Sequence, residues 1–218
     1  MRQALALALA LGAATLPALA EDFHGKGLRP FIGAGFTWGG DTITPVTITP
    51  QGSSTHYEED ISAGAGLALQ FGLSYRLSNA PITLQASVGY HNDQASGLDG
   101  RFYFRRIPLE LMAQWHAGDR TRVGFGVRRG TRAKFVEDGG TCTYTDPTTN
   151  TNTSGPCAIN ERMKGSTGVV LEVEQMLTPS WGVKARYVHE YYRFNDLTVD
   201  DHKYDGNHIG LMTTFYFN

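Results

Sequence analysis

Nine charged residues occupy alternate positions that they share with glycines and other small or polar residues. They are Arg106, Glu110, Arg122, Arg128, Glu172, Glu174, Lys184, Arg186 and Glu190. Acids and bases occur together, so their chemistry is expected to be ion pairing. A buried charge that loses its partner costs about 3–5 kcal/mol. We therefore expect a packed electrostatic plug, and the alternative is a narrow ion path through rearranged pairs.

Two short turns predict which of these charges face each other. A reversal at residues 117–120 and another at 178–181 bring the flanking segments side by side. Residues directly opposite each other on paired strands lie within side-chain reach. The predicted cross-strand pairs are Glu110 with Arg128, Glu172 with Arg186, and Glu174 with Lys184.

Cys142 and Cys157 flank a polar, turn-rich segment and are the two cysteines of the chain. In an exported protein this spacing predicts a disulfide that closes a surface loop. The chain-entropy model gives such a crosslink about 3 kcal/mol of stabilisation. The pattern offers no redox or metal motif, because no C-x-x-C is present.

Signals for an enzyme or a cofactor are weak. His91, His189 and His208 are expected near strand ends as polar rim residues, and no P-loop or H-E-x-x-H motif occurs. The acidic runs at residues 58–60 and 200–205 could hold a divalent cation, since oxygen ligands suit Ca²⁺ and Mg²⁺. Solvated loop tips explain the same runs more simply. We expect no catalytic residue, no metal and no cofactor.

A period of two predicts the strands that must position the charges. Between Ile61 and Tyr75 every odd position is apolar, while the even positions are small or polar. Fifteen residues exceed the usual strand length of about 5–6. Seven other segments repeat the pattern. The eight predicted strands are 28–38, 61–76, 82–91, 102–115, 121–135, 165–177, 182–194 and 207–217.

The connections between these strands alternate in length. The short ones predict tight periplasmic turns and the long ones predict exterior loops, as in outer-membrane barrels. The long connections are 39–60, 91–101, 136–164 and 195–206. Bulky apolar residues share one face and charges the other, whereas a soluble barrel would have its apolar face inside. The predicted fold is an all-β, eight-stranded antiparallel up-and-down transmembrane β-barrel; the alternative is a secreted soluble barrel or sandwich.

Aromatic residues cluster at the ends of the predicted strands. Amphipathic rings prefer the headgroup level of a bilayer, so two belts are expected. The same argument places Phe102 and Phe104 in the belt on the long-loop side. The predicted membrane-interface aromatics are Trp38, Tyr75, Tyr90, Trp115, Trp181 and Phe217.

Composition and the N-terminal segment bound the class of protein. The chain has 218 residues, 26 glycines, and 19 basic against 21 acidic residues, a net charge of −2 that argues against nucleic-acid binding. Residues 1–20 combine Arg2, a short apolar run and the small-residue pattern Ala18-Leu19-Ala20. This arrangement is typical of a cleaved signal peptide. The expected mature domain is 21–218, and the protein is expected to be exported.

Three stretches resemble the small outer-membrane β-barrel family of the OmpA and OmpX type. RIPLEL at 106–111 resembles the fourth strand of that family. The segments VLEVE, LTPSW and ARY within 170–187 resemble its sixth and seventh strands and their turn. GNHIGL and FYF within 206–217 resemble its closing strand, although Asn218 follows the terminal aromatic residue.

The resemblance implies a place in the outer membrane of a Gram-negative-type bacterium. The expected partners are outer-membrane lipids, lipopolysaccharide, and the barrel-assembly machinery through the C-terminal strand; a monomer is expected. The expected function is a non-enzymatic barrel with a charge-plugged lumen and a structural or surface-interaction role. The alternatives are a small-solute or ion channel, although a wide lumen needs about 16 strands, and an outer-membrane lipid-modifying enzyme.

Overall fold

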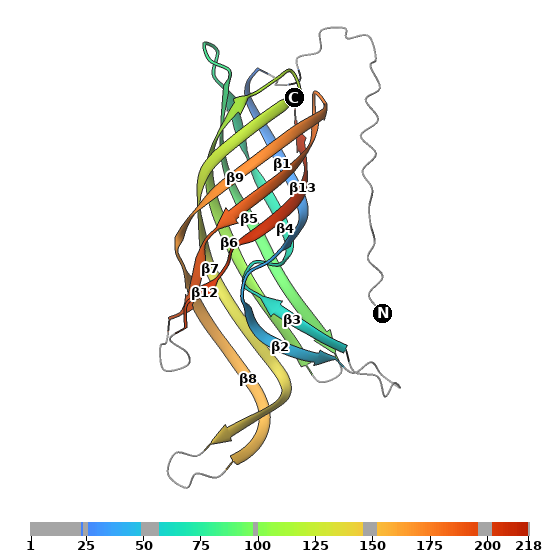
Figure 1. Cartoon of the computed structure of the whole chain (residues 1–218), viewed down its shortest axis with the longest axis vertical. Helices are drawn as coiled ribbons and strands as arrows, with labels where there is room; N and C mark the ends of the chain where they lie inside the picture. The colour runs from blue at the N-terminus through green and yellow to red at the C-terminus, as the bar shows by residue number, and fades with distance from the viewer. Residues whose placement is uncertain are drawn as a thin grey trace.

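A computed structural model describes residue 23 and residues 26–48, 57–97, 100–145, 152–195 and 202–217 (Figure 1). No helix in these ranges is long and apolar enough to cross a membrane. The described strands are β1 (Gly27–Trp38), β2 (Thr42–Ile48), β3 (Tyr57–Ser62), β4 (Gly66–Arg76), β5 (Ile82–Gly97), β6 (Gly100–His116), β7 (Thr121–Thr145), β8 (Asn152–Gly165), β9 (Thr167–Thr178), β10 (Trp181–His189), β11 (Tyr191–Phe194), β12 (Tyr204–Asp205) and β13 (His208–Tyr216).

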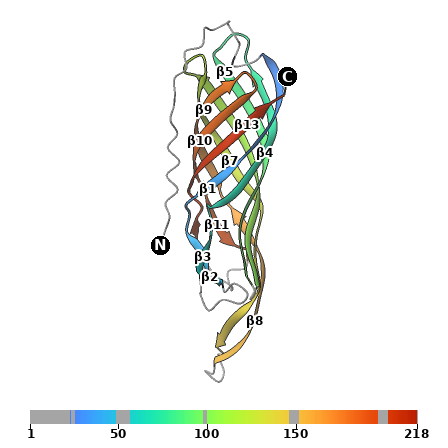
Figure 2. The ribbon, with the colours of Figure 1, turned by 90° about the vertical axis from the view of Figure 1, so that its right-hand side faces the viewer.

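Eight of these strands close into an antiparallel barrel. Their order around the barrel is β1, β4, β5, β6, β7, β9, β10 and β13. The barrel closes because β1 pairs with both β4 and β13, while β7 pairs with β9. Figure 2 shows these strands winding obliquely around the barrel axis. The predicted eight-stranded antiparallel fold is confirmed.

The barrel is apolar on its outside. Along β13 buried and exposed residues alternate strictly, and the exposed positions carry Ile209, Leu211 and Phe215. Leu111 of β6 is 61% exposed, whereas the next inward residue, Met112, is 5% exposed. Water would penalise so many exposed apolar side chains, and a lipid bilayer would not. The interpretation of the alternation as an inside-out, transmembrane barrel is therefore confirmed.

The second predicted strand was wrong at its start. β4 begins at Gly66, and Ile61 and Ala63 are fully buried rather than exposed on the lipid face. The chain bends between β3 and β4, where Gly66 has a φ of +116°. A Cβ atom at Gly66 would lie 2.2 Å from the carbonyl oxygen of Asn92. This bend interrupts the alternation, so the apolar residues before it point inward.

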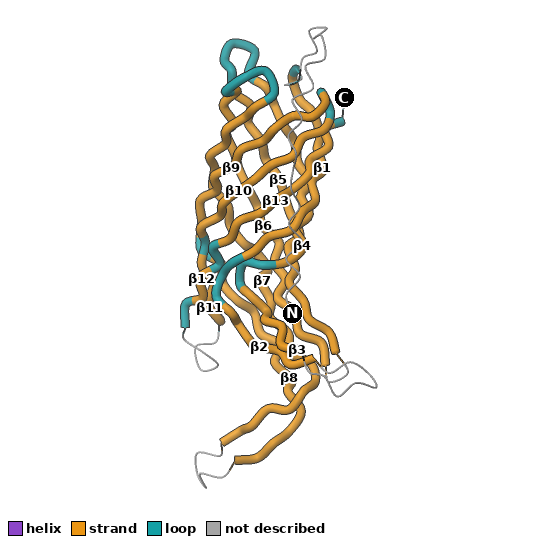
Figure 3. The backbone as a smooth tube through the Cα atoms, turned by 45° about the vertical axis from the view of Figure 1, so that its right-hand side comes forward, coloured by secondary structure: helices purple, strands orange, loops and turns teal. Residues whose placement is uncertain are grey.

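The predicted loop at 136–164 was also wrong for most of its length. β7 continues to Thr145 and β8 begins at Asn152, and the two strands pair up to the Thr145–Asn152 register. This hairpin projects beyond the closed barrel at the lower end of Figure 1 and in the tube view of Figure 3. The predicted strand 182–194 divides into β10 and β11, and β11 pairs with β8.

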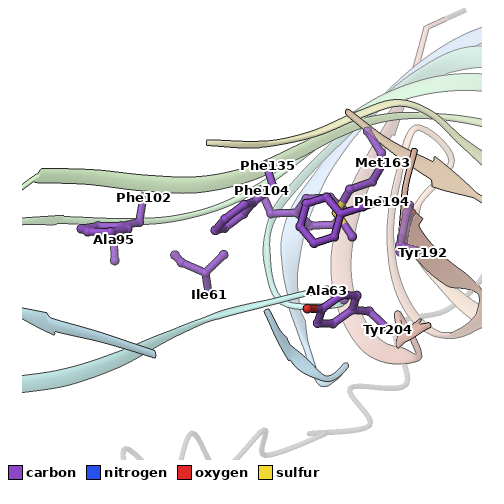
Figure 4. Packing of buried hydrophobic residues seen from close by; sticks show 11 residues of the cluster. Ile61, Ala63, Ala95, Phe102, Phe104, Phe135, Met163, Tyr192, Phe194 and Tyr204 are labelled. Atoms are coloured by element: carbon purple, nitrogen blue, oxygen red, sulfur yellow. The ribbon is translucent and has the colours of Figure 1, made fainter. Parts of the chain in front are cut away.

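An aromatic cluster covers the lumen on the long-loop side. Phe104 stacks edge-on against Tyr192 with their ring centroids 5.1 Å apart, and Phe135 meets Phe194 at 6.2 Å (Figure 4). Phe102 and Phe104 were predicted in the exterior belt, but both are buried here. We take the long-loop side, which is the lower end of Figure 1, as the upper side of the barrel, and we call this cluster the upper plug. It comprises Ile61, Ala63, Ala95, Phe102, Phe104, Ala133, Phe135, Met163, Tyr192, Phe194 and Tyr204.

A second, smaller cluster lies at the short-turn end. Phe31 and Tyr216 have ring centroids 5.6 Å apart, and Phe23 and Met176 complete the group. All four side chains are buried. The polar part of the lumen is therefore enclosed between two apolar clusters.

Candidate functional site

The nine charged residues singled out from the sequence all point into the barrel. Each is at most 5% exposed. Alternation on β6, β7, β9 and β10 places them on the inward face, and Glu190 follows the end of β10. The structure thus gathers the charges into one buried layer.

Glu110 lies at the centre of this layer. Its Oε1 accepts a hydrogen bond from Arg128 Nη1 at 2.9 Å, and its Oε2 accepts one from Arg186 Nη2 at 2.7 Å. Gln70 Nε2 donates to the same Oε2 at 2.8 Å. The carboxylate thus joins four strands, because β4, β6, β7 and β10 each supply one of these groups.

The backbone register matches the predicted charge positions, but one predicted pair differs. Glu172 stands opposite Arg186, and Glu174 stands opposite Lys184. The Arg186 guanidinium nevertheless binds Glu110, while Lys184 Nζ lies 3.6 Å from Glu172 and 4.0 Å from Glu174. Register sets only the Cα neighbours, and the long arginine side chain reaches across the narrow lumen instead.

The lower part of the layer centres on Glu174. Both of its carboxylate oxygens accept from the Tyr216 hydroxyl at 2.8 Å, and Arg122 Nη1 lies 3.5 Å away. Gln114 Nε2 donates to Glu172 at 2.6 Å, and Gln85 donates to the Tyr216 hydroxyl. These uncharged partners were not singled out from the sequence, although their inward positions in the alternation could have identified them.

The upper part connects histidines to arginines. Arg128 binds Glu190 through Nε at 3.2 Å, and its Nη2 lies 3.1 Å from His91 Nδ1. Arg106 Nη2 lies 3.2 Å from the other ring nitrogen of His91. His91 and His208 were expected at the polar rim, but both are buried, and their ring centroids are 5.2 Å apart.

Arg106 has fewer polar contacts than the other buried arginines of the described residues. Arg106 is stacked over Phe104 at 4.8 Å, and within the described part of the chain no carboxylate forms an ion pair with it. Its Nε and Nη1 atoms have no hydrogen-bond partner among the described residues. In the described ranges six cationic and four carboxylate side chains are buried. The cations are Arg29, Arg106, Arg122, Arg128, Lys184 and Arg186; the carboxylates are Glu110, Glu172, Glu174 and Glu190.

An acidic contact beyond the apolar band holds the upper plug in place. The backbone amide of Ser62 donates to Asp93 at 2.7 Å, which ties β3 to β5. Burial raises the pKa of the Asp93 carboxyl, and this hydrogen bond opposes the rise. Burial also raises the pKa of Glu137 on the β7 extension. The Asp93 contact positions Ile61 over the lumen.

The six predicted interface aromatics are all on the exterior. Trp38 and Tyr90 lie at the long-loop side of the apolar band, and the other four lie at the short-turn side. Their role as membrane belts stays a prediction. The exposed fractions are 58% for Trp38, 44% for Tyr75, 39% for Tyr90, 56% for Trp115, 49% for Trp181 and 42% for Phe217.

Several sequence predictions lie outside the described residues. The signal peptide at 1–20 and the acidic residues at 200–201 are among them. The backbone of β7 and β8 places Cys142 opposite Gly155, but the side chains of Cys142 and Cys157 are not described. The disulfide therefore stays a prediction. Among the described residues, no group of three or more His, Cys, Asp or Glu side chains could hold a metal ion.

Comparisons with known proteins find similarity in structure. No family model and no curated protein matches the sequence. Neisserial surface protein A superposes with a TM-score of 0.49 at 11% identity, covering 88% of this chain and 98% of that one. The attachment invasion locus protein Ail of Yersinia pestis gives 0.42 at 14%, covering 88% and 100%.

A third solved structure shows a similar degree of likeness. The N-terminal β-barrel domain of Pseudomonas aeruginosa OprF gives a TM-score of 0.38 at 12% identity, covering 88% of this chain and 99% of that one. The eight-stranded barrel that the sequence resemblance implied is confirmed by the strand pairing of this chain itself.

Proposed function

We propose that the protein is a non-enzymatic, non-conducting barrel of the bacterial outer membrane with a structural or surface-interaction role. The observation that carries this proposal is the ion-paired packing of the lumen. The carboxylate of Glu110 binds Arg128 and Arg186 across the middle of the barrel, between two apolar clusters.

An ion crossing this lumen would have to break buried contacts in succession. Separating one partner from a buried ion pair costs about 3–5 kcal/mol, and the central carboxylate holds two guanidinium groups. An eight-stranded barrel has an interior that side chains can fill completely. The packing therefore supports a plug rather than the channel alternative.

The same contacts support a role without catalysis. A general acid or base must reach a substrate, whereas Glu110, Glu172 and Glu174 are buried and held by cations or amide groups. The contacts argue against a catalytic role for these lumen carboxylates, and a lipid-modifying enzyme at the outer rim stays the second alternative.

The β7–β8 hairpin supports the surface-interaction role. It leaves the closed barrel beyond the Ala133–Met163 pair and continues to the Thr145–Asn152 pair. The paired backbone carries the chain beyond the barrel on this side (Figure 1). We propose that this hairpin is displayed on the outside of the cell.

Conductance and surface display are tested separately. The pure protein in a planar bilayer should give no steady single-channel current, while a 16-stranded porin in the same membrane serves as the conducting control. Steady, ion-selective currents from the wild type would overturn the plug. For display, an epitope tag is inserted between Thr145 and Asn152, and a matched tag is inserted in the turn between Leu77 and Pro81.

Antibody should label the hairpin tag on intact cells. The turn tag should be labelled only after the outer membrane is permeabilised. The reverse pattern would contradict the proposed orientation.

A further inference from the structure

Seven cationic side chains gather on one side of the outer wall, immediately beyond the apolar band at the long-loop side. They lie on β6, β7, β8 and β11 and face outward, opposite to the buried residues that alternate with them. The chain has 19 lysines and arginines in all, so this concentration is local. We call it the basic patch: Arg105, Arg129, Arg132, Lys134, Arg162, Lys164 and Arg193.

Strand register places cations of the basic patch directly opposite one another. Arg105 of β6 pairs with Lys134 of β7, and Lys134 pairs in turn with Arg162 of β8. In the next row, Lys164 of β8 stands opposite Arg193 of β11. Like charges at directly opposite positions destabilise a sheet. The arrangement therefore has an electrostatic cost that a bound anion would remove.

Among the described residues, no acidic side chain pairs with these cations. In the part of the chain that the structure describes, no carboxylate forms an ion pair with a residue of the basic patch. Further along the same face, Arg101 does have an acidic partner: its Nη2 lies 3.1 Å from Asp138. The contrast shows that an ion pair can form on this face of the barrel, whereas none forms in the basic patch among the described residues.

The wall is hollowed beneath four of these cations, Arg105, Arg132, Lys134 and Arg162. A cavity of about 860 Å³ is lined by Tyr90, Arg105, Ile107, Arg132, Lys134 and Arg162, among others. Its volume falls within the range of about 300–1,000 Å³ typical of small-molecule sites. The pairing of β6 with β7 is irregular between Arg105 and Ile107, and Arg132 has a φ of +49°. Bulges and left-handed residues of this kind are concentrated at functional sites.

The level of the basic patch matches lipid headgroups. Below it on β6, Leu109 and Leu111 are 50% and 61% exposed, and below it on β7, Val127 and Phe125 face outward. Arg129 lies between that apolar band and the rest of the patch. A ligand here would therefore place its charge among the cations and its apolar part along the barrel wall. Arginine suits phosphate because its planar guanidinium binds two oxygens at once.

We propose that the basic patch binds the phosphate groups of lipid A, the phosphorylated glycolipid portion of lipopolysaccharide. This inference rests on the proposed function, because it requires the long-loop side to face the outer leaflet. The cation row would contact the phosphates, and the exposed leucines below it would contact the acyl chains.

Native mass spectrometry of the detergent-solubilised barrel tests this directly, with bisphosphoryl lipid A as the probe. The test variant is R105Q/K134Q/R162Q, and the matched control K26Q/R76Q/R120Q removes the same charge at the short-turn side. A heat-modifiability gel establishes that each variant has folded. The wild type and the control should retain lipid A, and the test variant should bind at least about tenfold more weakly.

Further probes separate the possible sources of the anion. Monophosphoryl lipid A should bind more weakly than the bisphosphoryl form, and millimolar inorganic phosphate should displace little of it. Equal binding by the test variant, equal loss in the control, equal binding of phosphatidylglycerol, or displacement by inorganic phosphate would overturn the proposal. Because this assay contains no cell, it can fail while the epitope-tag result stands, and the converse also holds.

Discussion

Glu110 offers the sharpest test of the lumen, because its two cationic partners differ in what else they can bind. Replacing Glu110 with glutamine removes the charge that both Arg128 and Arg186 contact. Arg128 keeps Glu190 at 3.2 Å and His91 at 3.1 Å. Arg186, within the described residues, keeps a weak contact of 3.6 Å to the sulfur of Met212. The stranded charge is therefore that of Arg186.

The expected magnitudes follow from this inequality. Glu110→Gln should lower the free energy of unfolding by about 3–5 kcal/mol, the usual cost of leaving a buried charge unpaired. Adding Arg186→Gln should recover much of that loss, since it removes the stranded charge. Adding Arg128→Gln should recover less, because it also takes the partner of Glu190 away. The coupling energy should thus be larger for the Glu110–Arg186 pair than for the Glu110–Arg128 pair.

The two pairs form two double-mutant cycles, Glu110 with Arg186 and Glu110 with Arg128. The stability of the wild type and of each single and double variant is measured by urea unfolding in lipid vesicles, followed by tryptophan fluorescence and by the heat-modifiability shift. Met112→Leu, a volume-conserving change on the same strand, controls for general disturbance of the interior and should cost under about 1.5 kcal/mol. Additive effects in both cycles, or a larger rescue by Arg128→Gln, would refute the assignment of Arg186 as the dependent partner.

Other substitutions test the lipid face, the bend and the hairpin. Leu111→Arg should destabilise the inserted barrel by about 2–4 kcal/mol if this position lies near the bilayer midplane. Leu111→Ala should be far milder. Equal losses of unfolding free energy in vesicles would contradict the assignment of Leu111 to the lipid-facing side. Gly66→Ala should cost about 1–3 kcal/mol, since the residue has a positive φ and its Cβ would meet the backbone. Gly118→Ala, which meets open space, should leave the unfolding midpoint nearly unchanged. Serine at both Cys142 and Cys157 should leave the heat-modifiable band intact but make the β7–β8 hairpin more sensitive to protease added to whole cells; unchanged cleavage would argue against the disulfide.

Periodicity of two was sufficient to predict most of the barrel. Side chains on a strand point alternately to opposite faces. Because the charged and small residues share one face along eight segments, the bulky apolar residues had to face the exterior. The inward position of Glu110 and Arg128, and their direct opposition across the turn between β6 and β7, followed from counting back from that turn. These are local properties, and a local pattern can determine them.

Where the alternation is interrupted, the sequence pattern could not predict which side chains point into the barrel. Ile61 and Ala63 belong to the apolar series by sequence but lie inside, because the bend at Gly66 depends on close approach to the Asn92 backbone of a different strand. Phe104 belongs to the strand-end aromatic residues that were predicted to face the membrane, yet its side chain points inward and stacks on Tyr192. Such contacts join residues far apart in the chain.

Tertiary structure alone decided the partners of the long side chains. Glu172 and Arg186 are neighbours in register, but a guanidinium on a flexible stem can cross a narrow lumen, and Arg186 finds Glu110 on a non-adjacent strand. The row of Arg105, Lys134 and Arg162 likewise exists only because β6, β7 and β8 pair in one register. The sequence determined which face each charge occupies, because alternation is a local property. The folded barrel determined which charges meet, because strand pairing and side-chain reach depend on residues far apart in the chain.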